Sequence, residues 1–370
     1  MPLSPLRVVL GERSYTITIG AGVLDQAGEL LAPLVARPEL VVVTDANVAL
    51  TRHPLRLMAS LERAGIAARK IVLPAGEATK SWAALERLVE DLLAGGVERR
   101  SMLVALGGGV VGDLVGFAAA VTLRGLDYVQ VPTTLLAQVD SAVGGKTGIN
   151  TRHGKNLVGA FHQPRAVLID TSVLDDLPAR DLKAGYAELV KYGFIKDADF
   201  FAWLEEHGRA VLRGEAQARA HAIRRSLEIK AAVVAADERE TTGGERALLN
   251  FGHTFAHAYE ALAGYDGGLL HGEAVAVGMI RAFDLSVRLD HCPPPELERA
   301  RAHLMQLGLP VRIAQVSNRT FPPEELLAAM GRDKKVENRR LRFVLARRIG
   351  AAFTASEVPE AALRAVLSAE

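Results

Sequence analysis

The stretch Leu103–Phe117, "LVALGGGVVGDLVGF", decides the fold because it joins a strand to a helix through glycines. An apolar run ends in consecutive glycines, and helical spacing follows. Gly107, Gly109 and Gly112 match G-x-G-x-x-G, a pattern in which glycine lets the backbone approach a pyrophosphate at a helix N-terminus. A tight strand-to-helix turn alone would explain the same glycines, so the motif by itself favours a dinucleotide site only weakly.

The same region is long and apolar enough, from Leu103 to Leu123, to resemble a membrane span. However, the glycines would weaken a spanning helix, and Asp113 would lie near the middle of the bilayer. A strand, a tight turn and a helix explain both features, so we expect no membrane segment.

Short β-branched runs alternate with helical patterns on both sides of this stretch, up to about residue 175. The runs are "RVVL", "YTITI", "ELVVVTD", "RKIVLPAG", "SMLVALGGG", "DYVQVPTT" and "RAVLID". Alternation of this kind predicts an α/β domain with a Rossmann-like, mostly parallel sheet, which we assign to residues 1–177. Residues 178–370 have helical spacing nearly throughout, apart from the strand-like "LRFVLARRIG", and are predicted to form a mainly α-helical domain.

Composition narrows the class of protein. The chain has 370 residues, 49% of them hydrophobic and 24% charged, enough for a large core and two domains. A formal charge of +1 with scattered basic residues argues against a nucleic-acid partner. Cys292 is the single cysteine, and the N-terminus lacks a signal-peptide pattern, so we expect a cytoplasmic protein without disulfides.

Polar residues follow several of the predicted strands. Asp45 ends "ELVVVTD", Glu77 and Lys80 follow the next strand in "PAGEATKS", and Thr133 and Thr134 end "DYVQVPTT". Because the carboxyl ends of parallel strands form the ligand-binding edge of α/β folds, we expect these side chains to gather there.

The segment 139–164, "VDSAVGGKTGINTRHGKNLVGAFHQP", is expected to be a loop. Its glycines are spaced between polar side chains, which a merely solvated loop would not need. We interpret this set as a site that reads anionic and hydroxyl groups: Asp140, Lys146, Asn150, Lys155 and Asn156.

In "NFGHTFAHAYE", His253 and His257 lie one turn apart on the same face of a predicted helix. The spacing is that of the HExxH zinc helix, but Thr254 stands where the glutamate general base would be. His271 begins another predicted helix, and Glu188 lies within a third. These residues are consistent with a His/carboxylate zinc site that keeps an open coordination position, although buried structural histidines would fit too. Spacing alone leaves open which histidines are ligands.

The other histidines are less informative. His162 is ambiguous between a structural and a functional role. The remainder lie in polar or arginine-rich surroundings and are expected at the surface: His53, His153, His207, His221, His291 and His303.

Seven segments between about residues 40 and 345 together resemble the 3-dehydroquinate synthase family. They occur in the order and at the spacing typical of that family, which is far more specific than any one motif. The segments are "PAGEATKS", "GGGVVGDLVGF", "VPTTLLAQVDSAVGGKTGIN", "GKNLVGAFHQP", "AELVKYG", "NFGHTFAHAYE" and "LLHGEAVAVGM".

The resemblance implies roles for individual residues. Glu188, His253 and His271 would bind zinc, or cobalt, whereas His257 would face the substrate. NAD contacts would be made by Asp45, Glu77, Lys80, Gly108, Gly109, Asp113, Thr133, Thr134, Asp140, Lys146 and Lys155. Substrate and phosphate contacts would be made by Arg124, Lys146, Asn156, Lys191, Lys230, Arg246, Asn250, His257 and Lys334. The first domain would bind NAD, the second the metal and substrate, and the chain would form a homodimer.

The implied activity is the conversion of 3-deoxy-D-arabino-heptulosonate 7-phosphate into 3-dehydroquinate and phosphate. This carbon–oxygen lyase reaction is the second step of the shikimate pathway to chorismate and the aromatic amino acids. It combines alcohol oxidation, phosphate β-elimination, ketone reduction, ring opening and an intramolecular aldol step, with NAD regenerated.

Two features depart from the family pattern. Asp176, in "SVLDDLP", stands where the family often has a threonine close to the cofactor, and the segment from Glu238 to Arg246 is longer than usual. Three alternatives remain open: a sugar phosphate cyclase whose substrate lacks a carboxylate, a metal-dependent polyol dehydrogenase, and a non-catalytic NAD-binding protein.

Overall fold

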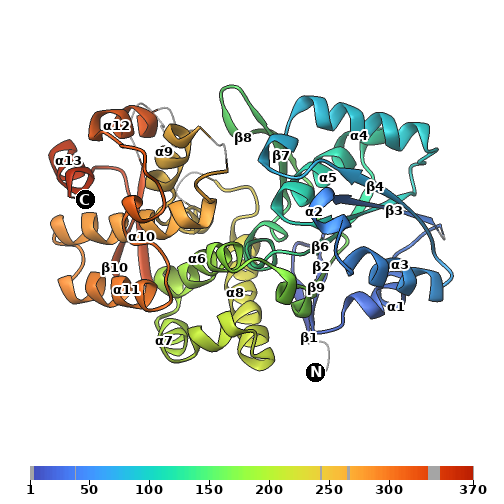
Figure 1. Ribbon diagram of the computed structural model, residues 1–370, viewed down its shortest axis with the longest axis horizontal. Helices are drawn as coiled ribbons and strands as arrows, with labels where there is room; N and C mark the ends of the chain where they lie inside the picture. The colour runs from blue at the N-terminus through green and yellow to red at the C-terminus, as the bar shows by residue number, and fades with distance from the viewer. Residues whose placement is uncertain (1–3, 38, 242–243, 265–266, 332–341, 370) are drawn as a thin grey trace. The chain divides into compact units, whose positions relative to one another are not determined.

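The computed structural model describes all residues except a few short segments (Figure 1). The described residues are 4–37, 39–241, 244–264, 267–331 and 342–369. None of the helices in these ranges is long and apolar enough to cross a membrane.

By its contacts, the chain divides into two compact units. The first comprises Met1–Pro178 and Arg219–Ala235, and the second comprises Ala179–Ala218 and Ala236–Glu370. The second unit is therefore interrupted by a segment that belongs to the first.

That interruption corrects the sequence-based division, which assigned all of 178–370 to one domain. Most of α8 (Ala216–Ala236) belongs to the first unit. There Arg219 donates a hydrogen bond to the Asp175 carboxylate at 2.6 Å, and Lys230 donates one to Asp140 Oδ1 at 2.7 Å. Helical spacing identified α8 as a helix, but spacing carries no information about which unit a helix joins.

The first unit is built on a seven-stranded sheet with the order β1-β2-β9-β6-β5-β3-β4. The β1–β2 pair is antiparallel and the other pairs are parallel, so the predicted mostly parallel sheet is confirmed. The strands are β1 (Ser4–Val8), β2 (Tyr15–Gly20), β3 (Glu39–Asp45), β4 (Ala67–Leu73), β5 (Met102–Gly107), β6 (Asp127–Pro132) and β9 (Ala166–Asp170).

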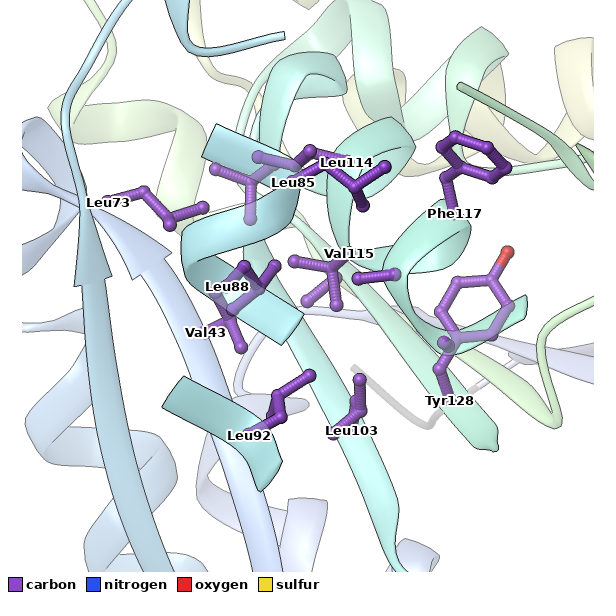
Figure 2. Packing of buried hydrophobic residues seen from close by; sticks show 14 of the residues in the cluster. Val43, Leu73, Leu85, Leu88, Leu92, Leu103, Leu114, Val115, Phe117 and Tyr128 are labelled. Atoms are coloured by element: carbon purple, nitrogen blue, oxygen red, sulfur yellow. The ribbon is translucent and has the colours of Figure 1, made fainter. Parts of the chain in front are cut away.

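Helices cover both faces of this sheet (Figure 1). The core beneath α4 and α5 is drawn in Figure 2, where Leu88 and Leu92 of α4 meet Val43, Leu103 and Val115. All six residues of β5 are buried, as expected for a central parallel strand covered on both faces. The helical segments are η1 (Leu24–Gln26), α1 (Ala27–Leu31), α2 (Ala46–Ala49), α3 (His53–Arg63), η2 (Glu77–Thr79), α4 (Trp82–Ala94), α5 (Gly109–Val121), η3 (Thr122–Arg124), the π-helical η4 (Ala137–Ser141) and η5 (Thr171–Asp176).

The segment expected to be a loop instead contains an antiparallel hairpin, β7 (Lys146–Thr151) with β8 (Gly154–Phe161). The expectation was wrong because glycine, which usually weakens strands, here permits close pairing. Gly148 and Gly159 are opposite each other, and a Cβ on Gly159 would lie 1.9 Å from the Thr147 carbonyl oxygen.

The second unit is mainly helical, as predicted. Its described helices are α6 (Ala179–Lys196), α7 (Ala198–Arg213), η6 (Glu245–Asn250), α9 (His253–Ala263), α10 (His271–Arg288), α11 (Pro294–Gln306), η7 (Ile313–Gln315), α12 (Pro323–Gly331) and α13 (Glu360–Ser368). The strand-like run forms β10 (Phe343–Arg348), which pairs with β11 (Ala351–Ala355) in a hairpin.

An aromatic cluster holds α6, α9 and α10 together in this unit. Phe194 of α6 lies 5.2 Å from Phe283 of α10, and Phe251, two residues before α9, lies 5.1 Å from Phe283, both measured between ring centroids. All three rings are buried, and aromatic pairs in edge-to-face geometry stabilise a core beyond their buried area. This cluster fixes the helices that carry the histidine-rich segments.

Two histidines expected at the surface are buried. His53 is 4% exposed and His303 is 3% exposed. His303 contacts the Tyr186 hydroxyl at 3.0 Å, and His53 Nε2 lies 3.6 Å from Asp176. Polar neighbours in sequence misled the prediction because the tertiary partners of both rings come from distant segments.

Candidate functional site

The glycine-rich turn places an open helix N-terminus at the carboxyl edge of the sheet. β5 ends at Gly107 and α5 begins at Gly109, so the predicted strand, turn and helix are confirmed. Gly108 is the N-cap of α5 and, as a glycine, provides no side chain to cap the first amides of the helix. A Cβ on Gly112 would lie 2.6 Å from Gln130 Oε1, so this glycine lets α5 pack closely on β6. Uncapped amides of this kind fit a pyrophosphate.

Lys80 is the centre of a polar cluster near this turn. The lysine is only 5% exposed, and its ammonium donates to Asp113 Oδ2 at 2.6 Å and to Asn156 Oδ1 at 2.5 Å. Burial raises the pKa of Asp113, although the ammonium of Lys80 opposes this. The structure thus brings together three residues that were separated in sequence.

Asn150 joins further members of the same cluster. Its side-chain amide donates to Glu77 Oε1 at 2.7 Å, and its Oδ1 accepts from the backbone N–H of Asn156 at 3.0 Å. Lys155 Nζ lies 3.8 Å from Glu77 Oε1. Sequence reasoning singled out Asn150 as a ligand-reading residue, whereas its described contacts hold neighbouring site residues in place.

Of the remaining predicted cofactor residues of the first unit, Asp45, Thr133 and Thr134 lie at strand ends, and Asp140 lies in η4. Asp45 Oδ1 accepts from two backbone amides that begin α2. Thr133 and Thr134 follow β6, and Thr134 accepts a hydrogen bond from the backbone of Ala137 at 3.1 Å. Asp140 pairs with Lys230, as described above.

Arg124 has an unusual backbone. Its φ is 70°, and that of the preceding Leu123 is 49°, so two consecutive non-glycine residues adopt left-handed conformations. Such strain is stored preferentially at functional sites. The guanidinium is exposed, as is the ammonium of Lys146.

In the second unit, Glu188, His253 and His271 converge on one point. Their ligand atoms all lie within 4.8 Å of one another, and each histidine Nε2 is 3.3 Å from Glu188 Oε1. Glu188 lies in the middle of α6, while His253 and His271 are the first residues of α9 and α10. Three helices thus contribute one side chain each.

Close helix crossings make this convergence possible. A Cβ on Gly272 would lie 1.9 Å from the Ala184 carbonyl oxygen, so only glycine lets α10 begin against α6. A Cβ on Gly278 would lie 2.3 Å from the carbonyl oxygen of Gly252, which directly precedes α9. The small residues therefore set the distances between the three ligands.

Burial and neighbouring charges shift the pKa of each residue in this cluster. Burial would raise the pKa of Glu188, but Lys191 and His253 hold it well below its ordinary value. Burial lowers the pKa of His253 to about 4, against the effect of the Glu188 carboxylate. Burial also opposes the charged form of His271, but Glu260 and Glu188 outweigh it and raise its pKa to about 10.

The donor set itself fits zinc or cobalt. Both carboxylate oxygens of Glu188 are buried: Lys191 forms an ion pair with one, and the Nε2 atoms of both histidines lie 3.3 Å from the other. Two imidazole nitrogens and one carboxylate oxygen form a typical catalytic zinc set with an open position. A cation at this point would satisfy the buried oxygens.

His257 lies beside the cluster without being part of it. Its ring centroid is 5.5 Å from that of His253 and perpendicular to it, and 6.3 Å from that of His271. The nitrogens that converge on Glu188 are those of the other two histidines. The substrate-facing role of His257 stays a prediction.

In the segment from Glu238 to Arg246, which was expected to be longer than in the family, several described residues contact neighbours in or next to the segment. Arg246 is buried and donates to the backbone carbonyl of Glu238, and the Asn250 amide donates to Glu240 Oε1 at 2.8 Å. The Asp237 carboxylate accepts from the backbone and hydroxyl of Thr241. Lys334, another predicted substrate contact, lies outside the described residues.

Comparisons with known proteins identify the family of this chain. Family profiles described as 3-dehydroquinate synthase N-terminal and C-terminal match residues 70–184 and 185–336. A 3-dehydroquinate synthase from Rhodospirillum rubrum is 59% identical over 99% of this chain and 94% of its own length.

Two solved structures share the fold at lower identity. The 2-epi-5-epi-valiolone synthase ValA from Streptomyces hygroscopicus, with NAD+ and Zn2+ bound, has a TM-score of 0.87 and 30% identity, covering 99% of this chain and 98% of its own. A 2-deoxy-scyllo-inosose synthase complexed with carbaglucose-6-phosphate, NAD+ and Co2+ has a TM-score of 0.86 and 26% identity, covering 98% and 99%. With family profiles that match most of its length and a relative this similar over nearly the whole of it, the chain belongs to the 3-dehydroquinate synthase family.

Proposed function

We propose that this protein converts 3-deoxy-D-arabino-heptulosonate 7-phosphate into 3-dehydroquinate and phosphate, with NAD and a zinc or cobalt ion as cofactors. The observation that carries the proposal is the convergence of Glu188, His253 and His271, in a chain similar over nearly its full length to a 3-dehydroquinate synthase. The implied reaction needs both a redox cofactor and a Lewis acid.

The first unit would bind NAD. The uncapped N-terminus of α5 can receive the pyrophosphate, and the carboxylate of Asp45 can accept hydrogen bonds from a ribose. ValA, the structural relative with 30% identity, carries NAD+. The polar cluster of Lys80, Asp113 and Glu77 would hold the remainder of the cofactor.

The second unit would bind the metal. When bound to Glu188, His253 and His271, the ion would polarise the substrate's hydroxyl and carbonyl oxygens. These three residues leave coordination positions open for the substrate. Lys191, which is 1% exposed and ion-paired to Glu188, keeps this carboxylate ionised.

The expected substrate residues supply charges that match the substrate. Arg124, Lys146 and Lys191 would bind the phosphate, for which cationic side chains are suited. Arg246 offers a planar fork to the carboxylate, and His257 with Asn156 would orient the leaving phosphate. The remaining expected contacts are Lys230, Asn250 and Lys334.

The reaction would proceed as a closed redox cycle. Oxidation of a secondary alcohol acidifies the adjacent C–H, and phosphate then leaves by β-elimination and can itself take up that proton. Return of the hydride to the ketone regenerates NAD, after which ring opening and an intramolecular aldol step close the carbocycle. Because the hydride returns, NADH does not accumulate.

The test measures phosphate release by the metal-loaded protein with NAD far below the substrate concentration, while NADH absorbance is followed. We expect many phosphates per NAD and no rise in NADH. A heptulose 7-phosphate that lacks the carboxylate is the matched control substrate and should release far less phosphate. Preference for that control would favour a carboxylate-free cyclase, and accumulating NADH would favour a polyol dehydrogenase.

The assembly and cellular location belong to the same proposal. We infer a cytoplasmic homodimer, supported by the single cysteine and by the family to which the chain belongs. Sedimentation equilibrium should give twice the chain mass, and a concentration-independent monomer would contradict the dimer.

A further inference from the structure

His271 meets a carboxylate at each of its ring nitrogens. Its Nε2 lies 3.3 Å from Glu188 Oε1, and its Nδ1 lies 3.3 Å from Glu260 Oε2. Both carboxylates are buried, with side chains 1% and 3% exposed. Glu260 was not among the residues singled out from the sequence.

We propose that Glu260 is a positioning residue of the metal site, which accepts the Nδ1–H of His271 and so leaves the Nε2 lone pair for an ion bound beside Glu188. This inference rests on the proposed metal site. A neutral imidazole carries one N–H and one lone pair, so fixing the N–H at Nδ1 leaves Nε2 as the ligand atom. Carboxylates in this position also raise the basicity of a metal-binding histidine.

The other histidine of the cluster has the same arrangement. The Nδ1 of His253 contacts the Phe251 backbone carbonyl at 3.2 Å, while its Nε2 faces Glu188 Oε1. Each ring therefore has an acceptor at Nδ1 and the shared carboxylate at Nε2. For His253 the acceptor is backbone, and for His271 it is the Glu260 side chain.

The position of Glu260 on α9 carries an electrostatic cost. Glu260 lies in the last turn of the helix, where the helix dipole disfavours a negative charge. Its side chain is also buried, and burial disfavours the ionised carboxylate further. Glu260 follows His253 by seven residues and His257 by three, so all three lie on one helical face. One face of α9 would thus carry a ligand, a substrate contact and the orienting group for a ligand on α10.

The experiment compares zinc affinity, measured by competition with a chelator, in the wild type and in Glu260→Ala and Glu260→Gln. Losing such a partner weakens metal binding by roughly 10- to 100-fold, which is the effect expected for Glu260→Ala. Glu260→Gln keeps an acceptor oxygen without the charge, so its zinc affinity should fall less than that of Glu260→Ala. The absorption spectrum of the Co2+-loaded protein should shift in the Ala variant, because His271 is no longer held in place.

Glu273→Gln is the matched control. Glu273 is another buried acid in the first turn of α10, but its described partners are Arg180 and the backbone of Leu270. We expect its zinc affinity to stay within about threefold of the wild type, below the range typical of an orienting partner. An equal loss in Glu273→Gln and Glu260→Ala would show that any disturbance of α10 suffices, and would overturn the proposal.

Two further outcomes separate the levels of the hypothesis. Unchanged zinc affinity and Co2+ spectrum in Glu260→Ala would refute the role of Glu260 while leaving the proposed function intact. Failure of the wild type to bind zinc or cobalt would instead refute the metal site itself. Thermal unfolding of the metal-free variants checks folding, and if Glu260→Ala does not fold, the isosteric Glu260→Gln carries the comparison.

Discussion

At the scale of single residues, the division of roles between His253 and His257 can be tested by metal content. We expect His253→Ala to lose stoichiometric zinc, because its Nε2 is one of the atoms that converge on Glu188. His257→Ala should keep zinc, because its ring lies beside that cluster and is not part of it. Metal analysis after dialysis against buffer distinguishes the two. Retained zinc in His253→Ala together with lost zinc in His257→Ala would reverse the assignment.

The buried side chain of His303 should make the free energy of unfolding depend on pH. Burial lowers its pKa to about 4, so the folded protein holds a neutral ring where the unfolded chain, with a pKa near 6.5, takes up a proton. Stability is therefore lost as the pH falls from about 6.5 toward 4. The histidine accounts for roughly 2 kcal/mol between pH 7 and pH 5.

Urea unfolding of the metal-free protein at these two pH values provides the measurement. Between pH 7 and pH 5, we expect the free energy of unfolding of His303→Gln to fall by about 2 kcal/mol less than that of the wild type. His291→Gln, in which the replaced histidine is exposed, is the matched control. Equal pH dependence in the wild type and His303→Gln would contradict the prediction.

At the scale of helices, the crossing of α9 and α10 is the feature on which the metal site depends. Gly278→Ala would bring a Cβ to 2.3 Å from the Gly252 carbonyl oxygen, and backbone cannot move aside as a side chain can. We expect a loss of stability of roughly 1–3 kcal/mol or more from overpacking. Zinc affinity should fall as well, because separating the helices moves His271 away from His253.

Gly331→Ala, at the end of α12, is the control for this substitution. A Cβ there would have nothing within 4 Å, so stability and zinc affinity should both be preserved. Thermal unfolding and chelator competition on the two variants give the comparison. Wild-type zinc affinity in Gly278→Ala would mean that the crossing distance does not control the site.

At the scale of the whole molecule, the membership of α8 predicts that residues 1–178 do not fold stably alone. Asp140 would lose its ion pair with Lys230, and Asp175 its ion pair with Arg219. We expect the fragment 1–178 to unfold without cooperativity. Joining residues 216–236 to it through a long flexible linker should restore a cooperative transition. A stable, cooperatively folding 1–178 fragment would show that α8 is dispensable to the first unit.

The sequence predicts the regular strands and helices better than it predicts the hairpin and the site. Continuous apolar runs such as β5 predict buried parallel strands, and helical spacing found α6, α8 and α10, because both patterns are properties of consecutive residues. The hairpin β7–β8 was missed because strand propensity cannot anticipate that Gly148 and Gly159 meet each other. The site residues were predicted largely from the family resemblance. A resemblance indicates which positions matter, but it does not show which residues those positions contact.

The sequence by itself determined which faces are apolar, where glycine opens a helix N-terminus, and that His253 and His257 share one side of a helix. Only the tertiary structure decided that Glu188, His253 and His271 converge, that Glu260 reaches His271, and that α8 packs with the first unit. The physical reason is that periodicity reports the face an element buries, whereas the partner of that face depends on how helices distant in sequence cross.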